Sequence, residues 1–253
     1  MKSSDRLLTM TKEIRHNDRV VDIGSDHGYL PLLLLRERIC SKVIVTDISP
    51  WSLKKAKKNI EREIIQGDNE GAISYRLGDG LEVLSKGEAN VAVIGGMGGL
   101  LISQILGKNI DTALSFDRII MQPRKNQGEL RYWLLNNGFT ISREHLAQEG
   151  RFICEIIVAE KARIPWNGPL WSLGTKIEYQ IPRQLLKAEE EDLVGPFLIK
   201  KLQQEETVEK ALGNLKNSDP GKKDILALRI EYVENLIEEF EKQESRVVIG
   251  ADQ

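Results

Sequence analysis

Short apolar runs alternate with longer amphipathic stretches through most of the first 137 residues of the chain. The runs are rich in β-branched residues and mostly apolar on both faces, which is typical of covered parallel strands; they are 19–24, 42–48, 73–79, 90–96 and 118–123. The stretches between them have helical spacing; they are 28–38, 49–63, 98–109 and 126–137. Within 49–63, we expect an inward face formed by Trp51, Leu53, Ala56 and Ile60. The alternation predicts right-handed βαβ units in a doubly wound, Rossmann-like α/β sheet.

The pattern changes at residues 139–161. The stretch "FTISREHLAQEGRFICEIIVAEK" is two extended runs joined at "AQEGR", which predicts an antiparallel hairpin rather than another βαβ unit. Five parallel strands ending in an antiparallel hairpin are the layout of class I S-adenosylmethionine (SAM) methyltransferases, whereas nucleotide dehydrogenases typically end in a further βαβ unit. We expect residues 1–165 to form this domain.

The remainder of the chain has a different composition. Residues 166–195 read as a connector, since 161–182 hold three of the eight prolines. An apolar stripe with spacings of four and three predicts a coiled-coil-like helical hairpin over 196–253; it is Leu226, Ile230, Val233, Ile237 and Phe240. A helical pair that merely closes the sheet domain fits the pattern equally well.

Composition and charge restrict the expected cellular location of the protein and the kinds of partner it could bind. No apolar run approaches a membrane span, and residues 1–15 lack the apolar core of a signal peptide. Cys40 and Cys154 stand in apolar contexts as buried thiols would, and three scattered histidines offer no metal-ligand spacing. We therefore expect a cytoplasmic protein without a metal, with the oligomeric state open and a monomer favoured. Residues 183–253 carry 11 basic and 16 acidic side chains, so a nucleic acid would more readily meet the first part.

Candidate ligand-binding residues fall where the predicted strands end. Gly24 and Gly28 follow the first strand, and Asp47 ends the second, where an acidic side chain can accept both hydroxyls of a ribose. Asp79 follows the third strand, and "GGMGG" (95–99) ends the fourth. Each feature alone has a purely structural explanation, such as a helix cap or a flexible loop. Their coincidence at one edge of a parallel sheet indicates a ligand site.

The charges of the glycine turn distinguish between cofactors. Asp22 and Asp26 would repel the pyrophosphate of a dinucleotide, but they can attract the cationic part of SAM. Methyltransferases that act on exocyclic amines of bases commonly carry an Asn/Asp-Pro-Pro-aromatic turn after the fourth strand. This chain has "GGMGG" there, which favours a ring nitrogen as the methyl acceptor.

Several motifs follow one another in order over residues 4–160: "DIGSDHGYLP", "GDGLEVL", "GGMGGLLISQIL", "QP" before "LRYWLLNNGF", and the closing hairpin. In these motifs the chain resembles the TrmK family of bacterial tRNA methyltransferases. The resemblance implies SAM-dependent methylation of N1 of an adenine in the D-arm region of tRNA, at position twenty-two. Two departures are "GGMGG" where many members have "AGMGG", and Arg124 where an Asn often follows "QP".

The site residues that this resemblance and the strand-end positions together imply fall into three groups. The expected cofactor-binding residues are Asp22, Gly24, Asp26, Gly28, Asp47, Ile48, Asp79, Gly80, Gly95, Gly96 and Met97. The candidate catalytic residues are Asp26, His27 and Gln122, and the expected substrate-binding residues are Arg6, Tyr29, Gly98, Pro123 and Arg124. Asp26 could instead only cap the following helix. A NAD-type oxidoreductase and a non-catalytic nucleic-acid-binding protein of the same fold stay open as alternatives.

Overall fold

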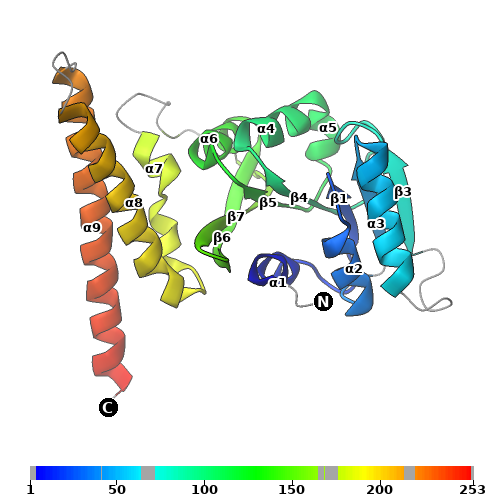
Figure 1. Ribbon diagram of the computed structural model, residues 1–253, viewed down its shortest axis with the longest axis horizontal. Coiled ribbons are helices and arrows are strands. Elements are labelled where there is room, and N and C mark those ends of the chain that lie inside the picture. The colour runs from blue at the N-terminus through cyan, green and yellow to red at the C-terminus, as the bar shows by residue number, and fades with distance from the viewer. Residues whose placement is uncertain are drawn as a thin grey trace. The chain divides into compact units, whose positions relative to one another are not determined.

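The computed structural model describes residues 4–40, 42–63, 72–164, 168, 176–213 and 220–251. The chain divides into two compact units, Met1–Gly168 and Pro169–Gln253, which are considered one at a time. Figure 1 labels their helices and strands. None of the described helices is both long enough and apolar enough to cross a membrane.

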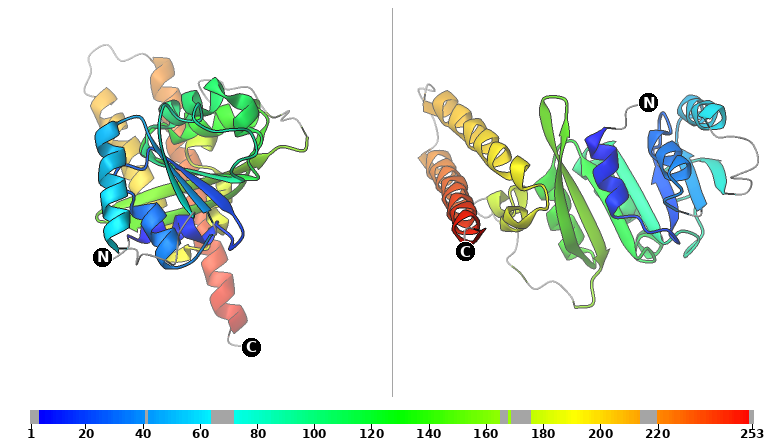
Figure 2. Two further views of the ribbon diagram at one scale, coloured as in Figure 1. Left: turned by 90° about the vertical axis from the view of Figure 1, so that its right-hand side faces the viewer. Right: turned by 90° about the horizontal axis from the view of Figure 1, so that it is seen from below.

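The first unit is a seven-stranded sheet with helices on both faces (Figure 2). The strands are β1 (Arg19–Ile23), β2 (Lys42–Asp47), β3 (Ile73–Leu77), β4 (Val91–Met97), β5 (Arg118–Pro123), β6 (Phe139–Glu149) and β7 (Phe152–Lys161). The helices are α1 (Asp5–Lys12), α2 (Tyr29–Arg36), α3 (Pro50–Glu63), α4 (Gly99–Lys108), α5 (Ile110–Ala113) and α6 (Gln127–Asn136).

The strand order, β3-β2-β1-β4-β5-β7-β6, confirms the predicted fold class. β1 to β5 pair in parallel, and β7 runs antiparallel to both β5 and β6, as the predicted hairpin requires. The chain runs outward from β1 to β3 and then crosses back to the other side of β1 to form β4. β1 and β4 therefore flank the switch point where doubly wound sheets bind ligands. The hydrophobic pattern did not predict α1 or α5.

Alternate residues of each central strand belong to two separate hydrophobic cores. Val20, Val43 and Val91 pack with α1, α2 and α3 on one face of the sheet. Val21, Ile44 and Ala92 pack with α4, α5 and α6 on the other face. Successive side chains of a strand point to opposite faces, so strands covered on both faces must be apolar throughout. This is why the first two strands read as continuous apolar runs.

One residue of the predicted inward face of α3 lies elsewhere. Ala56 and Ile60 are buried, but Trp51 is 79% exposed. A helix turns by about 100° per residue, which places Trp51 about 140° around the helix from Ala56. The expectation that Trp51 points inward was therefore wrong.

A buried ionic cluster joins α6 to the terminal hairpin. Arg131 of α6 is almost fully buried and lies 2.5 Å from Glu144 and 2.7 Å from Glu155, on β6 and β7. Burial alone would lower the pKa of Arg131, but the two carboxylates outweigh it and raise that pKa. The cation is therefore kept charged in the core, and removing it would leave two buried carboxylates without their counter-ion.

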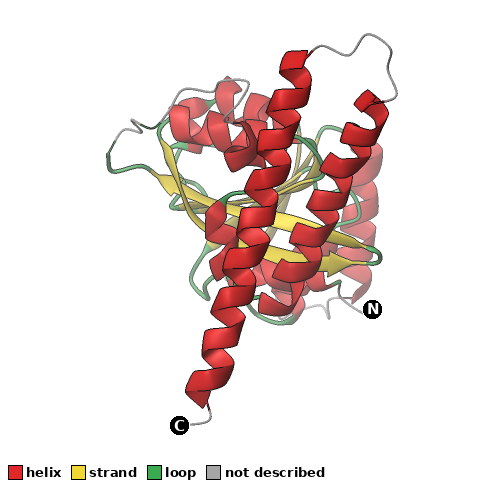
Figure 3. Cartoon of the chain, turned by 90° about the vertical axis from the view of Figure 1, so that its left-hand side faces the viewer, coloured by secondary structure: helices red, strands yellow, loops and turns green. Residues whose placement is uncertain are grey.

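The second unit contains α7 (Lys176–Gln180), a 3₁₀ helix η1 (Arg183–Lys187), α8 (Glu191–Gly213) and α9 (Pro220–Ala251). Figure 3 shows α8 and α9 side by side, and the colours of Figure 1 show that they run antiparallel. The helical C-terminal region is thus confirmed, with Leu226, Val233 and Phe240 of the predicted stripe buried. α8 begins at Glu191 rather than near Pro196, because acidic residues suit a helix N-terminus and Pro196 is accommodated inside the helix.

Candidate active site

The glycine turn after β1 is fixed to the end of β2. The amides of Gly24 and Ser25 both donate to the carbonyl oxygen of Thr46, at 2.9 and 3.0 Å. Gly24 and Gly28 have φ angles of +71° and +70°, which side chains rarely tolerate. A Cβ on Gly24 would also lie 2.0 Å from Cε of Met97, so the glycine lets β4 approach the turn closely. The turn is therefore enclosed by three strand ends.

Two carboxylates lie beside this turn. Asp22 is buried and accepts a hydrogen bond from the Ser25 hydroxyl. Burial raises the pKa of Asp22 to about 6, and repulsion from Asp47 adds to the increase, although the Ser25 bond opposes it. Asp47 accepts from the amides of Asp26 and Ser49, at 3.0 and 2.8 Å. This concentration of negative charge fits a cationic ligand such as SAM and disfavours a pyrophosphate.

Asp26 presents its side chain at the surface of the turn. It has a φ angle of +47°, and its side chain is 66% exposed. Gly28 is the N-cap residue of α2 and no side chain supplies a capping hydrogen bond there, so Asp26 does not cap the helix. Asp26 Oδ2 instead lies 3.3 Å from Nε2 of His27.

His27 connects the turn to α2 and α3. Its ring stacks on that of Tyr29, with centroids 5.1 Å apart and planes 16° apart. Lys55 Nζ lies 2.8 Å from His27 Nε2, and Asn59 donates to the His27 carbonyl oxygen at 3.1 Å. The imidazole is therefore held between Asp26, Tyr29 and Lys55.

Gln122 holds the glycine-rich loop that ends β4. It is 2% exposed, and its amide oxygen accepts from the Gly96 amide at 3.1 Å and from Arg6 Nη1 at 3.5 Å. Arg6 Nε in turn lies 2.8 Å from Glu149 Oε1 at the end of β6. Gln122 was a catalytic candidate, but its buried oxygen already binds protein groups. We infer that Gln122 positions the loop rather than contacting the substrate.

The "GGMGG" loop is packed against the loop that follows β5. The Arg124 amide donates to the Met97 carbonyl oxygen, and the Gly99 amide donates to the Lys125 carbonyl oxygen, both at 2.7 Å. A Cβ on Gly99 would lie 2.2 Å from the Asn126 carbonyl oxygen. Gly99 therefore allows the two backbones to meet, and the loop is held in place by backbone hydrogen bonds rather than being merely flexible.

The other predicted residues lie around the same edge of the sheet. Ile48 follows Asp47 and is 68% exposed, which leaves an apolar side chain at the rim. Asp79 forms an ion pair with Lys108 of α4, and neighbouring Gly80 has a φ angle of +58°. Gly95 lies against Arg6. Of the substrate candidates, Gly98 is the N-cap residue of α4 and Pro123 is the last residue of β5.

Four partners in the site were not predicted. They are Ser25, which binds Asp22; Lys55, which contacts His27; Glu149, which holds Arg6; and Lys108, which pairs with Asp79. Ser25 lies inside the turn motif and could have been found from it. Lys55 and Asn59 are four residues apart, which puts them on one helix face, but only the fold brings that face to His27.

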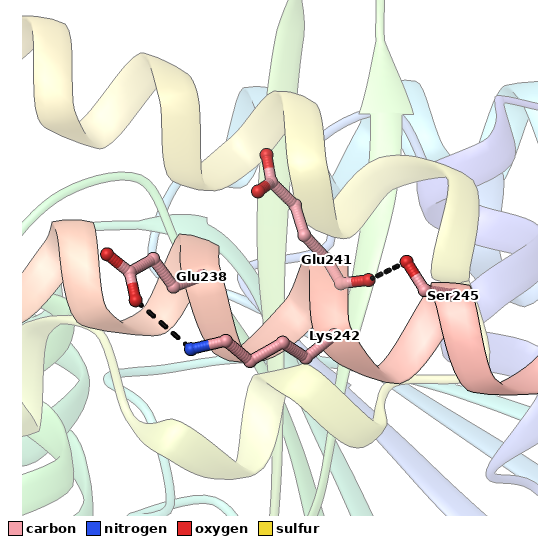
Figure 4. A pocket seen from close by; sticks show the side chains of 4 residues that line it. All are labelled: Glu238, Glu241, Lys242 and Ser245. Atoms are coloured by element: carbon pink, nitrogen blue, oxygen red, sulfur yellow. Dashed lines mark hydrogen bonds and ion pairs between the residues drawn. The ribbon is translucent and has the colours of Figure 1, made fainter.

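The second unit has a surface hollow on α9, which shares no residue with the candidate active site (Figure 4). Its lining residues are Glu238, Glu241, Lys242 and Ser245. Lys242 lies 3.1 Å from a Glu238 oxygen, and the Ser245 hydroxyl donates to the Glu241 carbonyl oxygen at 2.9 Å. The polar groups are thus paired with one another and acidic overall, which makes the hollow a poor site for a phosphate or a carboxylate.

Known proteins share both the sequence and the fold. Residues 3–157 match the family described as "Methyltransferase domain". The tRNA (adenine(22)-N(1))-methyltransferase of Bacillus subtilis is 33% identical over 202 residues, covering 79% of this chain and 76% of that protein. The crystal structure of the B. subtilis M1A22 tRNA methyltransferase TrmK has a TM-score of 0.75 at 29% identity, covering 93% of this chain and 99% of that one.

A Streptococcus pneumoniae protein solved in complex with S-adenosyl-L-methionine has a TM-score of 0.76 at 25% identity, covering 93% of this chain and 100% of that one. The resemblance noted from the motifs and the choice of SAM over a dinucleotide are both confirmed. The chain therefore belongs to the methyltransferase-domain family and, within it, to the family of tRNA (adenine(22)-N1)-methyltransferases.

Proposed function

We propose that this protein methylates N1 of adenine 22 in tRNA, with SAM as the methyl donor, in the cytoplasm. The observation that carries the proposal is the 33% identity to the B. subtilis enzyme of that name over 76% of its length. The buried Asp22 and Asp47 beside a glycine turn support it, because they suit the cationic cofactor. The same carboxylates argue against the NAD-type alternative.

The residues at and around the glycine turn contact different parts of the cofactor. SAM supplies an electrophilic methyl group on a sulfonium centre. Asp47 accepts the ribose hydroxyls, since each of its oxygens has further acceptor capacity beyond the amide that it already binds. The Asp22 carboxylate attracts the cationic part of SAM, and Ile48 offers an apolar surface to the adenine of SAM. Asp79 and Gly80 border that position from β3.

The exposed side of the turn would receive the target adenine. The stacked rings of His27 and Tyr29 form an aromatic wall next to the Asp26 carboxylate. Adenine N1 already carries a lone pair, so the protein's main task is to place the base rather than to remove a proton. Asp26 favours the positive charge that arrives on the ring, an interaction that is stronger in the transition state than before it. Arg6, Arg124 and the glycine loop define the opposite side.

The substrate is tested with two tRNA transcripts that differ only at position 22, carrying adenine or guanine. Incubation with SAM, followed by nucleoside mass spectrometry, should detect 1-methyladenosine only in the first transcript. Calorimetry with SAM and with NADH separates the enzyme from the oxidoreductase and from a non-catalytic binding protein. Absence of 1-methyladenosine in the adenine transcript, despite SAM binding, would overturn the proposed substrate.

Two variants test the roles of the carboxylates. Asp47→Ala should abolish measurable SAM binding, because each hydrogen bond to a charged acceptor contributes about 1.5–3 kcal/mol. Asp26→Ala should lower single-turnover methyl transfer by about a hundredfold and change SAM affinity much less. Asp111→Ala, on the surface of α5, is the matched control and should alter neither quantity. An equal, modest loss of rate and affinity in Asp26→Ala would reduce Asp26 to a cofactor-binding residue.

A further inference from the structure

The outer face of α3 carries a stripe of cations that begins at the candidate active site. The stripe consists of Trp51, Lys54, Lys55, Lys58 and Arg62, all of which lie on the exposed side of the helix. At about 100° per residue, these five positions fall within an arc of about 100°, and they extend over about 16 Å of helix. The helix has its acidic residues, Glu61 and Glu63, at or beyond the borders of this arc.

Most of the positive charge on the stripe is not neutralised within the protein. Lys54 Nζ lies 5.8 Å from the centre of the Trp51 ring, and Lys55 contacts the imidazole of His27. Among the residues that the structure describes, no carboxylate pairs with Lys54, Lys55 or Lys58. Arg62, the last cation of the stripe, lies 3.2 Å from Glu63, and Lys57, off the stripe, lies 3.7 Å from Glu61. A charged face on a helix usually has only a solvating role, but such faces generally mix both signs.

Trp51 adds an apolar group that the fold does not use. It is 79% exposed and lies at the first turn of α3, three residues after Ile48 at the rim of the candidate active site. A large exposed aromatic ring next to lysine side chains is typical of surfaces on which nucleic acids stack and neutralise their phosphates. An acidic protein partner would not require the ring, and a free phosphate would not require a stripe.

The stripe is connected to the residues that would face the target base. Lys55 contacts His27, His27 stacks on Tyr29, and Asp26 lies beside His27. An RNA strand whose adenine enters between these residues must continue past the rim of the site. Its neighbouring phosphates then meet either α3 or the loops on the other side, and α3 offers them three ammonium groups without a carboxylate partner in the described part of the chain.

We propose that the outer face of α3 binds the phosphate backbone of the tRNA next to the target adenine, with Trp51 stacking on a base or ribose. This inference rests on the proposed function. It assigns to Lys54, Lys58 and Trp51 a role in substrate affinity, with no part in the methyl transfer step or in cofactor binding.

The test compares two double charge reversals in the full chain. Lys54→Glu/Lys58→Glu alters the stripe. Lys42→Glu/Lys86→Glu makes the same charge change at two exposed positions, the first residue of β2 and the turn before β4, at the opposite end of the strands. For each protein, tRNA affinity is measured by filter binding over a range of salt concentrations, along with kcat and KM for tRNA and SAM affinity by calorimetry.

We expect the Lys54→Glu/Lys58→Glu variant to bind tRNA at least tenfold more weakly than the control at 100 mM salt, with KM raised in parallel. Two lost phosphate contacts should make the log–log salt dependence shallower by about 1.5. SAM affinity and kcat at saturating tRNA should stay within twofold of wild type. Trp51→Ala should weaken tRNA binding without changing the salt dependence, since it removes no charge.

Equal tRNA affinity in the two double variants, in a wild-type protein that does methylate tRNA, would show that the stripe is only a solvated surface. A fall in kcat or SAM affinity to the same extent as the fall in tRNA affinity would also overturn the assignment. If the wild type produces no 1-methyladenosine in tRNA, the proposed function fails first, and this inference fails with it.

Discussion

Asp22 is a buried acid placed where its ionised form is costly. Its side chain is enclosed at the end of β1, and burial together with the nearby Asp47 raises its pKa from 3.8 to about 6. The Ser25 hydroxyl compensates only in part. A residue of this kind is retained at the expense of stability, which is common where a site must hold charge for a ligand.

This burial predicts a pH-dependent stability difference for Asp22→Asn in the absence of SAM. Between about pH 4 and 6 the native protein binds the proton more tightly than the unfolded chain, so wild-type stability falls as pH rises through that window. Asp22→Asn has no carboxyl group at this position, so its stability does not fall for this reason as pH rises. Urea unfolding should therefore find it more stable than wild type at pH 7 by about 2–3 kcal/mol, and similar to wild type at pH 4.

Asp111→Asn on exposed α5 serves as the control and should match wild type at both pH values. A stability difference for Asp22→Asn that is the same at pH 4 and pH 7 would mean that the effect is one of packing, not of ionisation.

At the scale of the elements, the sequence predicted the strands well because β1 to β5 are rich in apolar residues, β3 least so, and are separated by clear helical patterns. It missed α1, a helix of eight residues capped by Ser4 within a charged segment, and α5, which is a single turn. The strand ends located Asp22, Asp47 and the glycine loops. The contacts of Lys55 and Glu149 depend on which elements pack together, and a local pattern carries no such information.

The close approach of α2 to α3 depends on one glycine, Gly28. Gly28 and Gly87 both have positive φ angles, of +70° and +75°. A Cβ at Gly28 would lie 2.9 Å from Cβ of Ala56 and 3.0 Å from Cδ1 of Ile60, whereas a Cβ at Gly87 would have no atom within 4 Å. The two glycines therefore share the backbone requirement but differ in packing.

Gly28→Ala should lower the free energy of unfolding by about 1–3 kcal/mol more than Gly87→Ala, because only the first forces apart two packed helices. The Gly87 variant should lose about 1–2 kcal/mol from backbone strain alone. Denaturant unfolding without ligand measures both. Equal losses would indicate that α2 and α3 separate freely and that the close approach has no energetic weight.

On the scale of the whole molecule, two units with separate cores and different charge share one chain. The first unit contains the candidate active site and is covered on both faces of its own sheet. The second has its own buried residues and an acidic composition, with 11 basic and 16 acidic side chains over 183–253. Such a unit would contribute to tRNA recognition through shape rather than through general attraction to phosphate.

Deleting residues 169–253 should leave a folded protein that binds SAM with wild-type affinity, since the residues of the glycine turn and both cores of the sheet remain. Methylation of whole tRNA should fall by at least tenfold, because the truncated protein loses the surface of the helical pair. Calorimetry and single-turnover assays measure the two quantities. Normal methylation by the truncated enzyme would leave the helical pair a purely structural role.

The pairing of β1 with β4 has a consequence for how the protein matures. The glycine turn follows β1 and is tied to β2, yet Met97, at the end of β4, lies against Gly24 and forms its third wall. A nascent chain leaving the ribosome can therefore join β1 to β2 early, while the turn stays incomplete until residue 97 has emerged and the non-local parallel pair has formed. Pairings of this kind form slowly. SAM can thus bind and stabilise the protein only after β4 has paired with β1. During refolding, SAM binding should therefore appear at the same rate as the slowest phase of sheet assembly.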